Sequence, residues 1–181
     1  MSELKIENIV FSANVAEKID IQYLSKQFVN SKYNLDEFSG LILDFNNPKC
    51  AVFLFPNGKI VCTGIKNFDD IEIIINRVIS DIEGYNITIF DDINIEIENI
   101  IASSRFTKNL NLDYIKDQIK FENIVNNNND FPGLIYNIPD LAINVIIFNS
   151  GKIIFTGGKE LEDIKKVLRM LNENLVNIGV L

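Results

Sequence analysis

Residues 55–66 read FPNGKIVCTGIK and residues 148–159 read FNSGKIIFTGGK, so one pattern of Phe, Gly-Lys and Thr-Gly occurs twice in this chain. Two shorter motifs recur in the same order: ENIV (7–10) returns as ENII (98–101), and FSGL (38–41) returns as FPGL (131–134). Ordered repetition of this kind indicates one structural unit written twice. The sequence therefore predicts a pseudo-symmetric fold built from two similar halves.

Composition is that of a compact globular protein. With 181 residues and 47% hydrophobic content, the chain is long enough and apolar enough to bury a core. No apolar run approaches the roughly 20 residues that a membrane-spanning helix needs, and the N-terminus lacks the basic and apolar regions of a signal peptide. We therefore expect an intracellular protein that makes no membrane contact.

Residue types that carry catalysis or bind metals are scarce. The chain has no His, and Cys50 and Cys62 lie in apolar, strand-like runs, which favours ordinary core cysteines over metal ligation or a disulfide framework. No nucleophile motif, phosphate-binding glycine loop or characteristic carboxylate pair is present. We expect no enzyme activity, no cofactor and no metal. The net charge of −8, shared equally by the halves, argues by itself against nucleic-acid binding.

Hydrophobic periodicity predicts the same elements in each half. Residues 4–12 and 95–103 alternate as strands, and each strand precedes a short helix, capped by Asp20 or by Asn111. Further strands are expected near 40–46, 50–56 and 59–65, with Gly-containing hairpins at 57–58 and 150–151. Each half is then expected to end in a long helix, and Asn67 caps the first of the two. The inward residues of the first helix are Phe68, Ile71, Ile74, Ile75, Val78 and Ile82. Those of the second helix are Leu161, Ile164, Val167, Leu168, Leu171 and Leu175.

This order of elements predicts an α+β fold in which a continuous antiparallel sheet has four helices on one face and leaves its other face open. If Val52, Leu54, Ile60 and Cys62 point to the helices, their strand neighbours point away from them. The outward residues are then Ala51, Phe53, Phe55, Val61 and Thr63, with Asn144, Ile146, Phe148, Ile154 and Thr156 in the second half. An apolar face without helices is typical of an interaction surface.

These duplicated motifs resemble the TATA-box-binding protein family of archaea and eukaryotes, over nearly the whole chain. The resemblance is carried by residues 8–10, Tyr33-Asn34 leading to Phe38, 55–66, 131–136 and 148–159. It implies two repeats, at residues 1–90 and 91–181, that form a curved, saddle-shaped sheet with the four helices on the convex face. Because the first repeat begins almost at residue 1, we expect an archaeal-type member.

In the family, the concave sheet face binds the DNA minor groove, and two pairs of Phe side chains wedge between base steps; these proteins are a standard example of such wedging. By position, the resemblance implies that Phe38 pairs with Phe55 and Phe131 with Phe148. The alternative for each is a core aromatic residue. Phe is suited to the wedge because it is rigid, apolar and able to stack.

The resemblance also assigns the other DNA contacts. Asn8 and Asn99 would donate from their amides to minor-groove acceptors, which favours A·T pairs because G·C pairs add an obstructing amino group. The remaining groove contacts would be Val10, Val61, Thr63, Ile101, Ile154 and Thr156. Phosphate contacts would come from Lys49, Lys59, Lys66, Lys152 and Lys159, joined by Arg105. The alternative for an Asn or Thr here is a merely solvated strand residue.

Several positions depart from the family pattern. Where the family places Arg or Lys, this chain has Glu37, Asp44, Asn137 and Ala142, and where it places proline, this chain has Leu35 and Leu141. Asn144 stands where an apolar residue is usual. With fewer basic residues we expect weaker DNA binding and a shallower dependence of affinity on salt. We interpret the chain as a divergent member of the family.

The resemblance predicts a general transcription initiation factor that binds A·T-rich promoter DNA, bends it, and recruits transcription factor B and RNA polymerase. It would act in the cytoplasm, or in the nucleus of a eukaryote. The alternative is a regulatory module of the same fold that binds protein and has little or no affinity for DNA. The acidic replacements favour the alternative; the Phe and Asn pairs oppose it. The free protein is also expected to self-associate through its apolar face.

Overall fold

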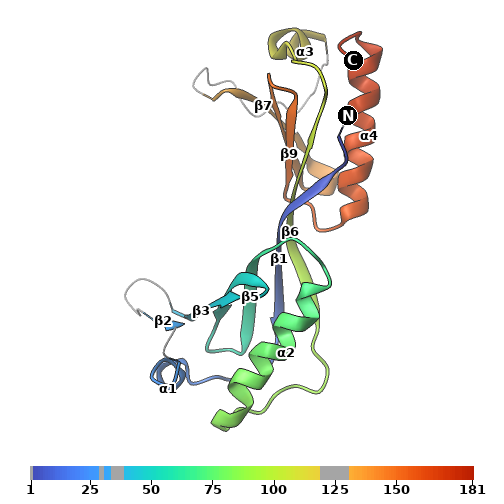
Figure 1. Ribbon diagram of the computed structural model, residues 1–181. Helices are drawn as coiled ribbons and strands as arrows, with labels where there is room; N and C mark the ends of the chain where they lie inside the picture. The colour runs from blue at the N-terminus through green and yellow to red at the C-terminus, as the bar shows by residue number, and fades with distance from the viewer. Residues whose placement is uncertain (1, 29–30, 34–38, 119–130) are drawn as a thin grey trace. The chain divides into compact units, whose positions relative to one another are not determined.

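The computed structural model describes residues 2–28, 31–33, 39–118 and 131–181, which form two compact units (Figure 1). The first-repeat unit is Asn8–Glu98, and the second-repeat unit combines Met1–Glu7 with Asn99–Leu181. Strands β1 (Lys5–Asn14) and β6 (Ile95–Arg105) each contribute residues to both units. The division predicted at residues 90 and 91 concerns the sequence repeat and stays a prediction.

The first-repeat unit is an antiparallel sheet with strand order β2-β3-β4-β5-β1. Beyond β1, its elements are α1 (Ile21–Ser25), β2 (Ser31–Lys32), β3 (Leu41–Asn46), β4 (Lys49–Leu54), β5 (Lys59–Ile65), α2 (Asp70–Ile82) and a 3-10 turn, η1 (Glu83–Tyr85). The three strands predicted after the short helix are therefore present, each within about two residues of its expected bounds.

The second-repeat unit has the strand order β6-β9-β8-β7. Beyond β6, its elements are α3 (Leu112–Gln118), β7 (Gly133–Ile138), a 3-10 turn, η2 (Pro139–Leu141), β8 (Ile143–Phe148), β9 (Lys152–Thr156) and α4 (Leu161–Asn177). Both units thus follow the predicted order of strand, short helix, strands and long helix. This is the structural counterpart of the repeated motifs.

Two of the three predicted helix caps are present. The Asp20 carboxylate accepts a hydrogen bond from the Tyr23 N–H (2.9 Å), and the Asn111 amide oxygen accepts one from the Tyr114 N–H (3.1 Å). The prediction that Asn67 caps the first long helix is wrong. Its side chain instead accepts from the Asp69 N–H (3.3 Å), two residues on, and α2 begins only at Asp70. Asn favours such a local turn, which delays the helix start.

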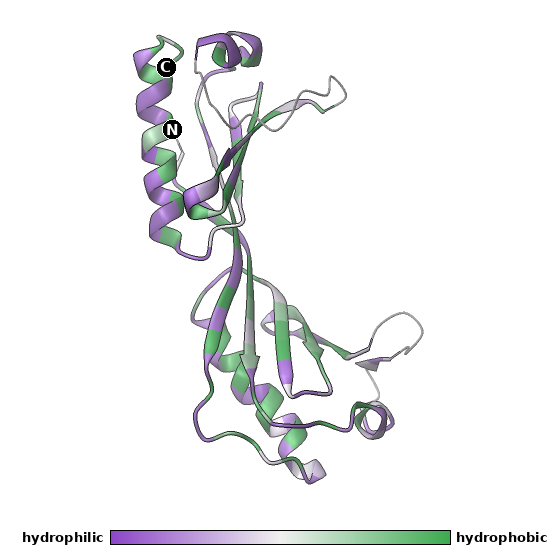
Figure 2. Ribbon diagram, turned by 180° about the vertical axis from the view of Figure 1, so that it is seen from behind, coloured by the Kyte–Doolittle hydropathy of each residue, from purple (hydrophilic) through white to green (hydrophobic). Residues whose placement is uncertain are grey.

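The core lies between the long helices and one face of the strands in each unit. Every predicted inward residue of α2 and α4 is buried except Phe68 and Leu161, which stand before or at the helix start and are half-buried. Figure 2 shows the alternating hydrophilic and hydrophobic bands along both helices. Cys50 and Cys62 are buried in the first-repeat core, as ordinary core cysteines would be. None of the described helices has the length and apolar composition needed to cross a membrane.

Candidate nucleic-acid interface

Each unit has a sheet face opposite to its long helix, here called the open face. On β4 and β5 of the first-repeat unit it carries Ala51, Phe53, Val61 and Thr63, and on β8 and β9 of the second it carries Asn144, Ile146, Ile154 and Thr156. These residues pair across the strands as Ala51↔Thr63, Phe53↔Val61, Asn144↔Thr156 and Ile146↔Ile154. All are half-buried, whereas their neighbours toward the helix are buried. The predicted alternation is therefore present in both units.

Asn8 and Asn99 are held in the same way, each by a glycine of the neighbouring strand segment. The Gly64 N–H donates to Asn8 Oδ1 (2.7 Å), and the Gly157 N–H donates to Asn99 Oδ1 (2.7 Å). Both glycines have positive φ, +107° and +98°, a conformation that other residues rarely adopt. Because the amide oxygen is occupied by the backbone, the NH₂ group is the part of each side chain left to meet a ligand.

The two amides differ in what their NH₂ groups contact. Asn8 Nδ2 donates to Thr63 Oγ1 (3.0 Å), which leaves it one further proton to donate. Asn99 Nδ2 has no hydrogen-bond partner within the part of the chain that the structure describes. The geometry therefore provides an amide donor on the open face of each unit. Minor-groove acceptors of A·T pairs require donors of this kind.

One of the two predicted Phe pairs is formed. The ring centroids of Phe131 and Phe148 lie 6.1 Å apart with the ring planes 51° from each other, and Phe131 is 39% exposed. Gly133 lies opposite Phe148 in the β7–β8 register, and a Cβ on it would stand 2.9 Å from Cε1 of Phe131. The missing side chain therefore makes room for the Phe131 ring. Phe55 is half-buried just after β4, and Phe38 lies outside the described residues.

The cations predicted to contact phosphate have unequal surroundings. Lys59 lies 3.5 Å from the carboxylate of Glu98, whereas Lys152 stands opposite Arg105, another cation, in the β6–β9 register. Lys49, Lys66 and Lys159 are exposed. Two of the residues that depart from the family pattern, Asp44 and Asn137, have a partner in their own unit. Lys32 Nζ contacts Asp44 (2.8 Å), and Asn137 Nδ2 donates to Asn144 Oδ1 (2.8 Å).

Sequence reasoning did not find two serine–glutamate pairs that the structure forms. The Ser12 hydroxyl donates to Glu98 Oε1 (2.7 Å) in the first-repeat unit, and the Ser103 hydroxyl donates to Glu7 Oε1 (2.8 Å) in the second. The signal was available, because each Glu precedes an interface Asn and each Ser follows an Asn by four residues. These pairs place carboxylates beside the residues predicted to meet DNA.

The comparisons with known proteins agree with this duplicated geometry. A family model described as "Transcription factor TFIID (or TATA-binding protein, TBP)" matches residues 3–85 and again residues 94–178. The chain belongs to this family. TATA-binding protein relatives match it almost end to end, so membership applies to both repeats.

This chain is similar to other members of the TATA-binding protein family in both sequence and structure. The chain is 35% identical to the TATA-box-binding protein of Archaeoglobus fulgidus, covering 99% of this chain and 98% of that one. It is 37% identical to TATA-box-binding protein 2 of Methanosarcina mazei, with the same coverage. The solved structure of Methanococcus jannaschii TBP matches with a TM-score of 0.86 and 31% identity, over 97% of this chain and 99% of that one.

These matches confirm the family and the fold class. In the described part of the chain each unit has an antiparallel sheet and two α-helices, and the chain matches the fold of a solved TATA-binding protein. The roles of the individual DNA-contacting residues stay predictions. Among the described residues, no group of three or more His, Cys, Asp or Glu side chains is placed to hold a metal ion.

Proposed function

We propose that this protein is a general transcription initiation factor that binds A·T-rich promoter DNA in the minor groove and bends it. The observation that carries this proposal is the repeated Asn geometry. In each unit a positive-φ glycine holds the amide oxygen, so that an NH₂ donor is presented on the open face. Family membership and the names of the relatives, TATA-box-binding proteins, support the same role.

In this proposal the Phe side chains act as wedges. Phe131 and Phe148 already lie against each other at the end of the β7–β8 hairpin, and Phe131 is exposed enough to enter a base step. Phe55 with Phe38 would act equivalently in the first repeat. Partial unstacking by apolar side chains is the usual way in which minor-groove proteins bend DNA. Val10, Val61, Ile101 and Ile154 would provide apolar contact between the wedges.

The partners proposed beyond promoter DNA are transcription factor B and RNA polymerase, and the proposed location is the cytoplasm of an archaeal-type cell. Family membership is the support for these assignments. Without DNA, the apolar open faces would favour self-association. We propose no catalytic activity.

A second candidate is a regulatory module that binds protein and has little affinity for DNA. It is favoured by one specific observation, the pairing of Lys59 with Glu98, which neutralises a cation predicted to contact phosphate. Free Lys and Arg side chains raise affinity for DNA by neutralising its phosphates, so a surface that binds DNA weakly can have its cations paired with carboxylates. The two candidates differ in whether this protein binds an A·T-rich duplex at all.

The experiment that separates them is binding to a labelled A·T-rich promoter duplex, followed by fluorescence anisotropy and end-to-end energy transfer. It is run across a salt series, with and without transcription factor B. Salt-dependent binding with shortened end-to-end distance supports the initiation factor. Absence of binding at low salt, even with transcription factor B present, rejects it in favour of the protein-binding module.

A further inference from the structure

A pocket on the first-repeat unit, here called the tyrosine pocket, contains none of the residues predicted to contact DNA. It has a volume of about 750 Å³ and is lined by residues 18–23, which lead into α1, by residues 84–87 in and after η1, and by Tyr33 and Pro56. Its lining includes three tyrosines, Tyr23, Tyr33 and Tyr85. We propose that the tyrosine pocket binds a segment of a partner protein in the polyproline II conformation, with a basic residue beside its prolines.

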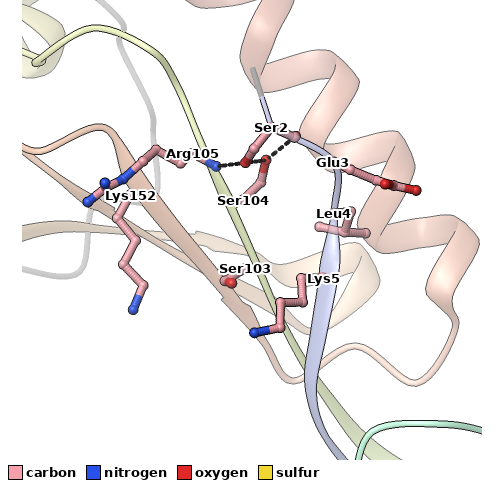
Figure 3. Close-up of a pocket in the computed structure, with 8 residues that line it drawn as sticks. All are labelled: Ser2, Glu3, Leu4, Lys5, Ser103, Ser104, Arg105 and Lys152. Atoms are coloured by element: carbon pink, nitrogen blue, oxygen red, sulfur yellow. Dashed lines mark hydrogen bonds between the residues drawn. The ribbon is translucent and has the colours of Figure 1, made fainter.

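A pocket of similar size on the second-repeat unit has a different chemistry. It has a volume of about 650 Å³, and its lining includes the cations Lys5, Arg105 and Lys152 (Figure 3). Arg105 and Lys152 are already predicted to contact phosphate, so this pocket belongs to the predicted DNA surface. The tyrosine pocket has one cation in its lining, Lys18, and aromatic rings instead. A ligand other than a DNA phosphate is therefore expected there.

The aromatic wall of the tyrosine pocket is held in place by ring contacts. The rings of Tyr23 and Tyr85 meet edge to face, with centroids 6.1 Å apart and ring planes 71° from each other. Tyr85 also packs on Phe28, at 5.8 Å between centroids. The backbone N–H of Tyr23 is bound by the Asp20 carboxylate, which fixes the first turn of α1. Because these rings are ordered before a ligand arrives, binding would order few further side chains.

The polar groups of the pocket suit a ligand that contains proline. Proline has no backbone N–H, and a polyproline II segment makes no internal hydrogen bonds, so its carbonyl oxygens need donors. The three tyrosine hydroxyls and the side-chain amides of Gln22 and Asn86 can donate, and none of these groups has a hydrogen-bond partner among the described residues. Aromatic-lined grooves are the usual sites that recognise proline-rich segments. The lining therefore matches such a segment in both ring and donor chemistry.

The charge around the pocket favours a basic residue in the ligand. Asp20 lies in the lining, and the exposed Glu17 and Glu83 directly adjoin lining residues in the chain. Within the described ranges, neither of these glutamates has an ion-pair partner. Three carboxylates thus outnumber the single cation, Lys18. Complementary charge across an interface favours the correct partner, so we expect Arg or Lys beside the prolines.

The second repeat differs at the matching tyrosine. Tyr114 is the counterpart of Tyr23, since each stands three residues after the residue that caps its helix, Asn111 or Asp20. The Tyr114 hydroxyl donates to the Ile178 carbonyl, just after α4 (3.2 Å). The Tyr23 hydroxyl has no such partner in the described part of the chain. We therefore expect the binding site on the first repeat alone.

The test measures the binding of labelled peptides to the full-length protein by fluorescence anisotropy. The probe is an oligoproline peptide with arginine at both ends. One comparison peptide has glutamate at both ends, and the other keeps the arginines but has glycine and serine in place of the prolines. Tyr23→Ala removes part of the aromatic wall, and because Tyr23 is 48% exposed, thermal unfolding should change little. Tyr114→Ala is the matched control, since Tyr114 is 43% exposed at the equivalent place on α3.

We expect the oligoproline peptide with arginine to bind the wild type, and Tyr23→Ala to weaken this binding about tenfold, as truncation of a central interface tyrosine does. Tyr114→Ala should have no effect, and the glutamate peptide should bind more weakly. Absence of oligoproline binding, equal losses in the two tyrosine variants, or equal binding of the glycine–serine peptide overturns the proposal. Equal binding of the arginine and glutamate peptides overturns the requirement for a basic residue. None of these outcomes depends on whether the protein binds DNA.

Discussion

The ammonium of Lys59 lies 3.5 Å from Glu98 Oε1, the same oxygen that accepts a hydrogen bond from the Ser12 hydroxyl at 2.7 Å. A cation predicted to contact DNA is thus already bound to a carboxylate of its own unit. A DNA phosphate must either displace Glu98 from Lys59, or bind with the negatively charged Glu98 carboxylate close to the DNA backbone. Either outcome lowers affinity, so Glu98 is expected to weaken DNA binding.

Replacing Glu98 by Gln should therefore strengthen binding. The amide oxygen of Gln can still accept from Ser12, while Lys59 loses its charged partner. We expect affinity for an A·T-rich duplex at low salt to rise about two- to fivefold, the range for a partly exposed ion pair, with a steeper salt slope. The control is Glu72→Gln on α2, which changes net charge equally at an exposed site. Equal gains in both variants would show a general charge effect and contradict a specific role for Glu98.

Phe131 should matter to DNA bending and little to folding. It is 39% exposed, so Phe131→Ala is expected to cost less than about 1 kcal/mol of stability, as is usual for exposed sites. Energy transfer across a bound duplex should report a smaller bend because one wedge is missing. Phe155→Ala is the contrasting variant: Phe155 is fully buried, and its truncation should cost about 3–5 kcal/mol in urea unfolding. If DNA is bent normally by Phe131→Ala, the wedge role is contradicted and Phe131 has only a structural role.

Gly133 should control the position of the Phe131 ring. In Gly133→Ala the new Cβ would stand 2.9 Å from Phe131 Cε1 and 3.1 Å from the Ile147 carbonyl oxygen, both too close for an ordinary contact. Because the ring can move more easily than the backbone, we expect it to shift away from Phe148. Energy transfer should show reduced bending, with a small fall in melting temperature. Gly84→Ala is the control, since no atom lies within 4 Å of its Cβ position; a bend reduced equally there would refute the explanation.

The parts of the fold that could be predicted are those that depend on local sequence. Alternation placed Ala51, Phe53 and Val61 on one strand face, and apolar spacing identified the buried residues of both long helices, because these periods are fixed by the geometry of strands and helices. Repetition then gave the second unit the same architecture as the first. The helix cap predicted at Asn67 is not formed, because an Asn side chain can accept a hydrogen bond in a tight turn as readily as at a helix start.

The interactions that could not be predicted join residues whose strands meet only in the folded protein. Glu98 and Lys59 are distant in sequence, and so are Ser103 and Glu7. Whether such side chains meet depends on the register of their strands, which hydrophobic alternation alone does not determine. The Thr-Gly repeats were recognised as family motifs, yet the role of Gly64 and Gly157 in orienting Asn8 and Asn99 required the backbone geometry.

Asn99→Asp tests the amide donor, because it separates the two functions of the Asn99 side chain: accepting the Gly157 N–H bond that orients it, and donating from its NH₂ group. Either carboxylate oxygen of Asp can accept the Gly157 N–H bond that Asn99 Oδ1 accepts at 2.7 Å, so the fold should be retained. The NH₂ donor, however, is replaced by a negatively charged acceptor facing the adenine N3 and thymine O2 acceptors of the groove. We expect affinity for an A·T-rich duplex to fall about tenfold or more, the cost of losing a donor that reads a base edge.

Asn76→Asp supplies the matched control, since it makes the same chemical change at an exposed position of α2. Binding is measured by anisotropy on A·T-rich duplexes and on duplexes with central G·C pairs, and folding by circular dichroism. Because the amide donor is the group that distinguishes A·T from G·C, Asn99→Asp should also narrow the difference in affinity between the two duplexes. If affinity falls equally for both, with the preference intact, the effect is charge repulsion and Asn99 does not read the base pairs.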